Sequence, residues 1–577
     1  RRRISSTSRK PLEVAEQTLA DGTVVEAIDP DEVRAAALEL LELGCEAVCI
    51  FFINGYANHL NEQEAAAVVR EVWPTPYVTA ATELLPEIRE FERCSTATLN
   101  AYLQPVVANY LSRLQDALGT GNADSDIMIV QSNGGVMSVD TAARAPVRTA
   151  LSGPAAGVIA ARHIAADAGF DNIITCDMGG TSFDVSLVVN GESAIAPQTQ
   201  IDFGMVVRTP MIEISTIGAG GGSIAYVDDG GLLEVGPDSA GSDPGPVAYG
   251  LGNDRPTVTD ANLVLGRINP QRPLGGDLEQ LDLPAAHRAI EERIAEPLGL
   301  DVMAAAEAII RVANAKMAGA IRLVSIERGH DPARFAAMPF GGGGALHTGA
   351  LLQEIGLAAA IVPRYPGVTS ALGCVVADMR LDRVQTVNAM LADLEMPGLH
   401  QEMGRLADEF ESELRSSAMA LDGYSRLFEL DMLYLGQTHT VTVPLAAELD
   451  EIDRTSIQAS FQRTYQDTYG RLLEGIPARV VNLRVAVIGK RPPLDLSRMA
   501  PSSGKSLEDC RLGERQIWWD GSAHTAPVYE RLDLPASACL PGPALLEQPD
   551  ATVFIDPGLT GRVDRAGNVI IRAEDAG

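Results

Sequence analysis

A short glycine turn between two apolar runs limits the possible folds most sharply. Residues 173–178 (IITCDM) and 183–189 (FDVSLVV) have the length and apolar character of buried strands. The four residues between them, GGTS, suffice only for a tight turn. The pattern predicts a β-hairpin whose turn directs backbone N–H groups outward, because paired glycines accept conformations that other residues avoid.

Elsewhere, helical patterns alternate with apolar runs typical of strands. This alternation predicts the α/β class. Pro105 lies inside one helical stretch, which we read as one long helix or two helices. The helices are expected at residues 31–46, 87–118, 150–169, 301–327 and 400–421, and strands at 47–53 and, as a pair, 427–444. Residues 490–577 are rich in Pro and Gly and are expected to form a separate β-rich tail.

Composition excludes several classes of protein. The chain has 577 residues, which predicts about three or four domains. Its net charge of −32 argues against nucleic-acid binding and against an anionic membrane surface. No run of about 18 apolar residues occurs, so no membrane span is expected. The seven cysteines have no paired spacing, which favours a reducing, cytoplasmic setting.

The predicted hairpin turn carries the residue types that phosphoryl chemistry needs. Gly179 and Gly180 would supply anion-binding N–H groups, and Thr181 and Ser182 add hydroxyl donors. Two carboxylates flank the turn and could hold Mg²⁺ or orient a water molecule; they are Asp177 and Asp184. A plain hairpin with a polar turn fits the spacing equally well.

A second glycine cluster, Gly341, Gly342, Gly343 and Gly344, lies between a predicted strand and a predicted helix. It would admit a flat or anionic ligand close to the backbone, and the helix N-terminus would favour phosphate. The cluster has neither the spacing of a P-loop nor that of a dinucleotide fingerprint. A tight strand-to-helix turn is the alternative.

Two further segments are rich in glycine. Residues 217–223 (IGAGGGS) include Gly220 and Gly221, and the Gly- and Pro-rich residues 235–246 follow as an expected ordered loop around a ligand. Residues 151–157 (LSGPAAG) start a helix that could meet phosphate or could simply pack closely. For Asp260 and Asn262 we favour helix capping over a role in a site.

Other catalytic classes lack support in the sequence. No GxSxG, HxxxH or HExxH pattern occurs. His59, His347 and His439 are therefore each expected to be structural. Cys45 and Cys49 stand in an apolar stretch and are expected in the core rather than on a metal.

A set of longer motifs, in a fixed order, resembles the hydantoinase A / 5-oxoprolinase family. The main motifs are DMGGTSFDVSL, IGAGGGSIA, VGPDSAGSDPGPVAYG, TVTDANLVLGR and PFGGGGALH, and EFERCSTATLNAYLQP, LSGPAAGV, PGVTSALG, LGQTHTVTVP and GPALLEQPDATV extend the resemblance. They run from about residue 13 to the end of the chain. A single Gly-Gly motif would be weak, whereas this ordered set is specific.

The resemblance implies an actin/Hsp70-like (ASKHA) ATPase core with a β-rich C-terminal domain. Residues 1–80 would be the tail of the family's N-terminal domain, 81–390 the core with its ATPase-like lobes, and 391–577 the C-terminal domain. By resemblance, residues 177–184 approach the phosphates or Mg²⁺ and residues 341–344 approach the nucleoside. The implied cofactors are ATP and Mg²⁺.

The implied activity is ATP-dependent opening of a cyclic amide such as hydantoin, N-methylhydantoin or 5-oxoproline, by phosphorylation of the lactam oxygen. A hydantoinase B-type partner subunit and an oligomeric assembly are expected. One alternative is the beta-type subunit of an ATP-dependent ketone carboxylase. The other is a non-catalytic scaffold, because the family's first Gly-Gly-Thr phosphate loop does not occur before residue 177. Arg479 also departs from the acidic residue that relatives often carry there.

Overall fold

The computed structural model describes residues 11–119, 127–200, 204–275, 278–417, 419–500 and 503–573. The chain divides into two compact units, and each is built from three chain segments. The first unit comprises residues 1–152, 196–211 and 378–492. The second unit comprises residues 153–195, 212–377 and 493–577. The predicted boundaries near residues 80 and 390 stay predictions about the sequence.

A nine-stranded sheet forms the centre of the second unit, and the predicted hairpin is part of it. Seven neighbouring strands follow one another in the order β14-β8-β7-β17-β18-β29-β28, β25 ends the row, and β9 pairs with β8. β7 and β8 are antiparallel with Asp177 opposite Asp184, which confirms the hairpin. β7, β17 and β18 run parallel. The strands are β7 (Ile173–Met178), β8 (Phe183–Val189), β9 (Glu192–Ser193), β14 (Ser215–Ile217), β17 (Ala336–Phe340), β18 (Ala359–Val362), β25 (Cys539–Pro541), β28 (Leu559–Val563) and β29 (Val569–Ala573).

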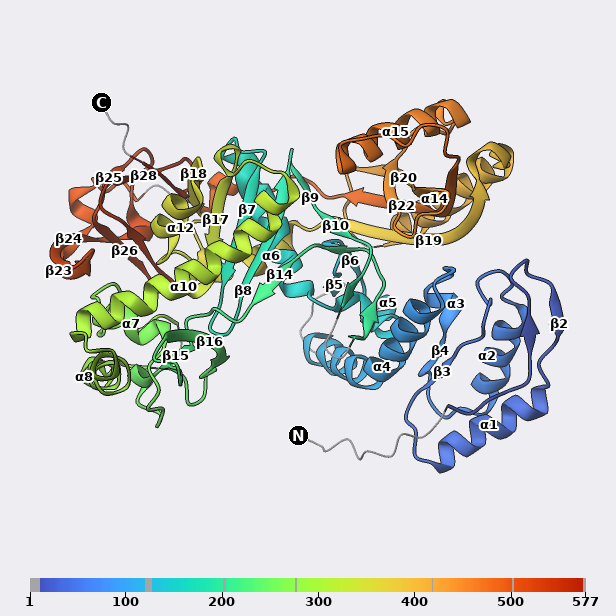
Figure 1. The fold of residues 1–577 in the computed structure, drawn as a ribbon, viewed down its shortest axis with the longest axis horizontal. Helices are drawn as coiled ribbons and strands as arrows, with labels where there is room; N and C mark the ends of the chain where they lie inside the picture. The colour runs from blue at the N-terminus through green and yellow to red at the C-terminus, as the bar shows by residue number, and fades with distance from the viewer. Residues whose placement is uncertain are drawn as a thin grey trace. The chain divides into compact units, whose positions relative to one another are not determined.

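Helices cover both faces of this sheet (Figure 1). Successive residues of a strand point to opposite faces, and in β7 both faces are buried. Ile173 packs in a cluster with residues of α6 (Ser152–Asp167), whereas Ile174 packs in a cluster with residues of α10 (Val302–Val324). The uninterrupted apolar character of residues 173–176 follows from this double burial. Other helices of the unit are α7 (Val258–Val264), α8 (Leu283–Ile290), α9 (Glu296–Leu298), α11 (Gly341–Gly344), α12 (Thr348–Ile355) and α13 (Thr369–Val376).

The end of the chain is rich in strands, as expected, but it is not a separate tail. β29 pairs with β18, so that Ile570 lies opposite Ile361, and β28 extends the same sheet. The expectation of a separate tail was wrong because nothing local in residues 559–573 reveals a partner strand some 200 positions earlier. The remaining strands of the unit are β15 (Ser223–Val227), β16 (Leu233–Ser239), β23 (Arg511–Trp519), β24 (Ser522–Glu530), β26 (Ala544–Gln548) and β27 (Ala551–Ile555).

The first unit contains a six-stranded sheet in the order β21-β20-β22-β19-β6-β5. Its long central strands, β19, β20 and β22, are antiparallel. A small parallel pair, β3 and β4, packs with α1 and α2 in a cluster of its own. The strands are β1 (Gln17–Thr18), β2 (Val24–Glu26), β3 (Val48–Ile50), β4 (Val78–Ala80), β5 (Met128–Val130), β6 (Val136–Ser138), β11 (Thr199–Gln200), β12 (Val206–Val207), β19 (Met379–Met390), β20 (Gly423–Tyr434), β21 (Val441–Pro444) and β22 (Ala478–Lys490). The short β10 (Ile195–Ala196) and β13 (Met211–Ile212) span the unit boundaries.

The helix around Pro105 is continuous. α4 runs from Glu90 to Gly119 with Pro105 inside it. Ala101, Gln104 and Leu111 are buried on either side of the proline, so tertiary packing holds a helix that loses one backbone hydrogen bond there. The other helices of the unit are α1 (Pro30–Glu42), α2 (Leu60–Val72), α3 (Ala81–Leu84), α5 (Val139–Arg144), α14 (Met396–Ser416) and α15 (Arg454–Tyr469). Within the described residues, no helix is long and apolar enough to cross a membrane.

Candidate functional site

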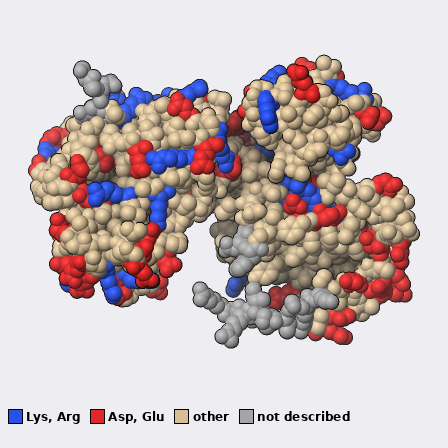
Figure 2. Space-filling model, in the orientation of Figure 1, with Lys and Arg blue, Asp and Glu red and all other residues tan. Residues whose placement is uncertain are grey.

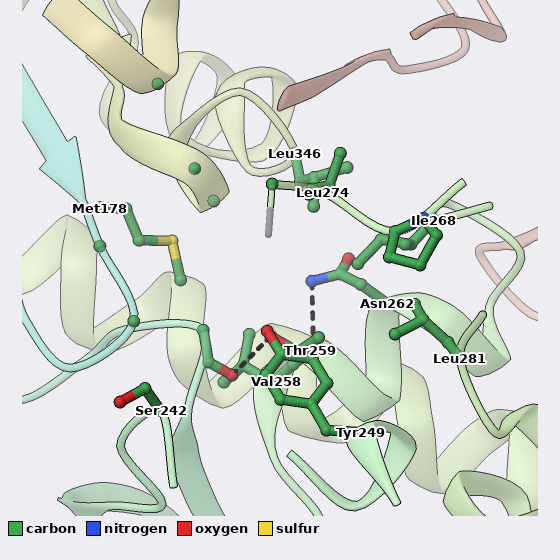
Figure 3. Close-up of a pocket in the computed structure, with 18 of the residues that line it drawn as sticks. Met178, Ser242, Tyr249, Val258, Thr259, Asn262, Ile268, Leu274, Leu281 and Leu346 are labelled. Carbon is green, nitrogen blue, oxygen red and sulfur yellow. Dashed lines mark hydrogen bonds between the residues drawn. The ribbon is translucent and has the colours of Figure 1, made fainter. Parts of the chain in front are cut away.

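A cavity of about 640 Å³ opens in the second unit, at the carboxyl ends of β7 and β17 (Figure 3). This volume falls in the range of sites that hold a small molecule or cofactor. Its wall combines bare glycine backbone with apolar side chains. The lining residues are Met178, Gly179, Gly180, Gly221, Ser242, Tyr249, Leu251, Val258, Thr259, Asn262, Ile268, Pro273, Leu274, Gly275, Leu278, Leu281, Gly342, Gly343, Leu346, His347, Gly367 and Asp550.

The hairpin turn and the 217–223 loop form one surface at the glycine end. Gly221 N donates to Gly179 O at 3.0 Å, and Gly222 N donates to Gly180 O at 2.6 Å. A side chain at Gly220 would put its Cβ 2.5 Å from Thr181 N, so only glycine fits. Two segments that the sequence presents as separate features therefore depend on each other for their conformation.

The 341–344 cluster also meets the hairpin. β17 lies parallel to β7 with Phe340 opposite Asp177, so the two strands end together. Gly341 follows with a φ of +78°, and a Cβ there would lie 2.5 Å from Asp177 Oδ1 and 2.4 Å from Met178 O. Only glycine accepts both this conformation and this approach. Gly342 and Gly343 then form part of the cavity wall.

Two carboxylates, Asp177 and Asp184, lie opposite each other close to the turn of the hairpin. Burial raises the pKa of Asp177 to about 6, and the neighbouring Asp184 charge adds to the effect. Burial also raises the pKa of Asp184, although hydrogen bonds from Thr216 and Ser182 oppose this. Asp184 Oδ1 is buried without a hydrogen-bond partner. Like charges placed directly opposite in a hairpin are destabilising, so this pair favours a proton or a cation.

The donor set fits Mg²⁺ only if a ligand completes it. Among the described residues, no group of three or more His, Cys, Asp or Glu could hold a metal by itself. Mg²⁺, however, is commonly held by one or two carboxylates together with substrate phosphates and water. Asp177 and Asp184 are two carboxylates beside the glycine turns that could play this part, and Asp184 Oδ1 has no hydrogen-bond partner.

The opposite end of the cavity is apolar. Figure 3 shows Ile268, Leu274 and Leu346 across the open space from Met178, with Tyr249 below. Such a wall suits a flat aromatic group, and the glycine end suits an anion. The cavity thus has a polar end formed by glycine backbone and an apolar end formed by side chains.

A buried chain of polar side chains ends at the cavity wall. His347 Nδ1 lies 2.6 Å from Asn314 Oδ1, and Asn262 Nδ2 lies 3.5 Å from His347 Nε2. Burial, with the nearby Arg267 charge, lowers the pKa of His347 to about 3, so the ring is neutral. Nδ1 then donates to Asn314 and Nε2 accepts from Asn262. In this series of hydrogen bonds, Asn262 Oδ1 is buried and has no partner. It is therefore an unused acceptor on a residue that lines the cavity.

These positions refine two sequence expectations. Asp260 is a cap, as favoured: it forms a capping box with Thr257 at the start of α7. Asn262 is not a cap, because it lies inside α7 and reaches the cavity. His347 is a buried, hydrogen-bonded residue, as expected of a structural histidine, but it also lines the cavity.

Three family models cover most of the chain. The hydantoinase/oxoprolinase N-terminal region matches residues 3–73, the hydantoinase/oxoprolinase model matches residues 93–383, and the C-terminal domain matches residues 395–571. The chain belongs to the hydantoinase/oxoprolinase family. The resemblance read from the ordered motifs is thereby confirmed.

Relatives in the hydantoinase/oxoprolinase family have different activities. The caprolactamase alpha subunit of Pseudomonas jessenii is 35% identical over 95% of this chain and 79% of its own length. The acetone carboxylase beta subunit of Xanthobacter autotrophicus is 28% identical over 94% of this chain and 78% of its own length. The 5-oxoprolinase of Dictyostelium discoideum is 27% identical over 95% of this chain, which spans 44% of that protein.

Solved structures agree with this grouping. The ATP-dependent caprolactamase from Pseudomonas jessenii superposes with a TM-score of 0.84 and 34% identity, over 97% of this chain and 82% of that one. A nucleotide-free acetone carboxylase superposes with a TM-score of 0.77 and 26% identity, over 97% and 81%. The mixed α/β fold is therefore shared with these two relatives, whereas the actin/Hsp70-like description stays a prediction.

The cavity of this hydantoinase/oxoprolinase chain collects part of the predicted site. Gly179, Gly180, Gly221, Gly342 and Gly343 line it. The other predicted residues do not line it but lie in the adjoining turns and strands: Asp177, Thr181, Ser182, Asp184, Gly220, Gly341 and Gly344. The functional roles of all these residues stay predictions.

The second turn of α6 is closely packed, whereas a role of its first turn in phosphate contact stays a prediction. A Cβ at Gly157 would lie 2.8 Å from both Phe340 Cε2 and Ser370 Oγ, which shows a close-packed helix. No residue of 151–157 lines the cavity. The apolar wall, by contrast, was missed by sequence reasoning. Some of its residues lie inside the family motifs, but nothing local marks them as one surface, and they converge only in the fold.

Proposed function

We propose that this chain is the ATP-binding subunit of an enzyme that opens cyclic amides by phosphorylating the amide oxygen. One observation carries the proposal: a single cavity has glycine backbone at one end, beside two carboxylates, and apolar side chains at the other. A nucleoside triphosphate with Mg²⁺ would match this arrangement, with its phosphates at the glycine end and its aromatic base at the apolar end.

The chain's own groups suggest how such a ligand is held. The backbone N–H groups of the glycine turns would donate to phosphate oxygens, since Asp550 is the only Asp, Glu, Lys or Arg among the lining residues and cannot itself attract phosphate. Asp177 and Asp184 would hold the Mg²⁺, which spreads the charge of the transferred group. The apolar wall would exclude water from the base, and Asn262 Oδ1 would accept a hydrogen bond from it.

The amide substrate needs activation because amides are poor electrophiles. Phosphorylation turns the amide oxygen into a good leaving group, and ATP supplies the phosphoryl group. The relatives named caprolactamase and 5-oxoprolinase support a cyclic amide as the acceptor. A hydantoinase B-type partner is part of the proposal, since the caprolactamase and acetone carboxylase relatives are named as subunits.

The acetone carboxylase relatives favour a second candidate, a subunit that activates a ketone for carboxylation. ADP release with the partner subunit distinguishes the two. The substrates compared are hydantoin, 5-oxoproline and caprolactam on one side and acetone with bicarbonate on the other. Stimulation by a cyclic amide supports the proposal. Stimulation by ketone alone overturns it.

A carboxylate variant tests the site itself. Asp184→Asn removes a metal ligand while keeping the shape of the side chain, so ATP turnover should fall at least about 100-fold with an unchanged circular-dichroism spectrum. Asp301→Asn is the matched control, because Asp301 caps α10 and asparagine caps a helix equally well. Unchanged turnover in Asp184→Asn would remove this residue from the mechanism.

A further inference from the structure

A small cavity in the first unit contains an arginine without a counter-ion. Its volume is about 60 Å³, enough for a small ion or a few water molecules. The wall comes from the end of α3, the β5–β6 turn, the 146–149 turn, the segment after β12, and β19. The lining residues are Glu83, Leu84, Leu85, Pro86, Gln131, Asn133, Arg148, Arg208, Thr209, Pro210, Asp382, Arg383 and Val384.

Arg148 is the unusual member of this wall. Among the described residues, its guanidinium has no hydrogen bond or ion pair within ordinary distance, although its backbone oxygen accepts from Ser132. Burial lowers the pKa of Arg148, while the charges of Asp382 and Glu413 oppose the effect. An unpaired arginine is unexpected in a chain with 77 acidic and 45 basic residues. Figure 2 shows acidic side chains scattered over both units, so carboxylate partners are not scarce.

The two carboxylates that line the cavity are already engaged. Asp382 receives two hydrogen bonds from Arg380 Nε, at 3.0 and 3.1 Å, and one from Asn133 Nδ2 at 2.6 Å. Glu83, at the exposed edge, pairs with Arg70 at 2.6 Å. Neither acid is therefore free to neutralise the Arg148 guanidinium.

The other basic groups of the wall have partners as well. Arg208 is buried and forms an ion pair with Glu87 at 2.5 Å. Arg383 lies 3.7 Å from Glu409. Each of these charges is neutralised by its partner. The cavity wall therefore carries one unneutralised positive charge, that of Arg148.

Thr209 adds a second unpartnered group to the wall of the same cavity. Thr209 is buried, and its hydroxyl has no hydrogen-bond partner. A buried hydroxyl without a partner costs about 1–3 kcal/mol. Two independent groups, a cation and a hydroxyl, thus lack an acceptor at one small cavity.

We propose that this cavity binds a small planar oxyanion, a carboxylate or bicarbonate, through the guanidinium of Arg148 and the hydroxyl of Thr209. A guanidinium presents two parallel N–H donors that match the two oxygens of such an anion. A cavity of about 60 Å³ favours a small anion of this kind. Nothing in this site depends on the proposed nucleotide function.

Calorimetric titration of the full chain with formate and with bicarbonate tests the proposal. We expect at least one of these ions to bind. Tighter binding of formate would indicate an organic carboxylate as the ligand, and tighter binding of bicarbonate would indicate the inorganic ion. Arg148→Met should weaken binding at least tenfold, and Arg148→Lys should recover only part of it, because lysine keeps the charge but loses the fork. Arg34→Met is the control, since Arg34 pairs with Glu71 on the surface of the same unit.

Thermal melts separate this role from a structural one. Without anion, Arg148→Met should melt at the wild-type temperature or higher, because an unpaired cation is removed. Added formate or bicarbonate should raise the melting temperature of wild type and of Thr209→Ser. The increase should be smaller for Thr209→Val, and Arg148→Met should show no increase. Three results would each overturn the proposal. The first is sulfate binding as tight as formate binding, and the second is equal anion affinity in wild type and Arg148→Met. The third is the absence of binding when formate or bicarbonate is in 50-fold excess over about 1 mM protein.

Discussion

The charge pair in the hairpin leads to a prediction whose sign is unusual for a buried aspartate. Asp177→Asn should stabilise the ligand-free protein at pH 8. The reason is that Asp177 is half-buried opposite Asp184, so its ionised form is penalised in the folded state. Asparagine keeps the size of the side chain and removes one of the two charges.

The magnitude follows from the pKa of Asp177. A rise from 3.8 to about 6 corresponds to at most about 3 kcal/mol, at 1.36 kcal/mol for each tenfold change in proton affinity. Because Asp177 is only partly buried, we expect about 1–3 kcal/mol. The unfolded chain loses this proton near pH 4 and the folded chain near pH 6. The contribution of Asp177 to stability therefore falls as pH rises from 4 to 6 and is level above that.

Hydrogen exchange at the β7–β8 amides measures the effect locally. The free energy of opening of residues 173–189 in wild type should decrease between pH 5 and 7, whereas Asp177→Asn should show a flatter profile. Asp301→Asn, at the cap of α10, should follow wild type. With Mg²⁺ and an ATP analogue, wild type should be protected more than Asp177→Asn, because the variant lacks one of the two proposed metal ligands. Lower protection in ligand-free Asp177→Asn at pH 8 would refute the reasoning.

Three further predictions concern other parts of the chain. Gly341→Ala should lower the free energy of unfolding by about 2–3 kcal/mol in denaturant melts, because its φ is +78° and its Cβ would meet backbone oxygen; Gly342→Ala, where nothing lies within 4 Å, should cost less than about 1 kcal/mol. Asn262→Leu removes the free acceptor at the cavity and should weaken ATP binding about 10-fold in calorimetry, while leaving the affinity for tripolyphosphate unchanged. Although burial raises the pKa of Asp431, the paired Arg484 outweighs it and holds the pKa below its usual value. Arg484→Met should therefore destabilise the first unit by about 3–5 kcal/mol at pH 7. In wild type this contribution is lost as pH falls below about 4, so thermal melts of the variant should depend less on acid; a wild-type-like acid profile would contradict this.

The sequence by itself determined the features that depend on neighbours along the chain. The apolar runs around GGTS fixed a hairpin, and with it the opposition of Asp177 and Asp184, because a four-residue turn leaves little freedom in register. The glycine clusters marked places where the backbone approaches another group. The ordered motifs identified the family, which the family models confirm.

Tertiary structure alone decided which of these features meet. Gly220 and Gly341 are over a hundred positions apart, yet both press against the hairpin turn, and their contacts show why each must be glycine. Asn262 and His347 carry no local signal for a cavity, since a polar residue in a helix and a lone histidine have many ordinary roles. β29 joins the central sheet next to β18 for the same reason. Local sequence sets backbone conformation, whereas burial and long-range pairing are decided only when distant segments exclude water together.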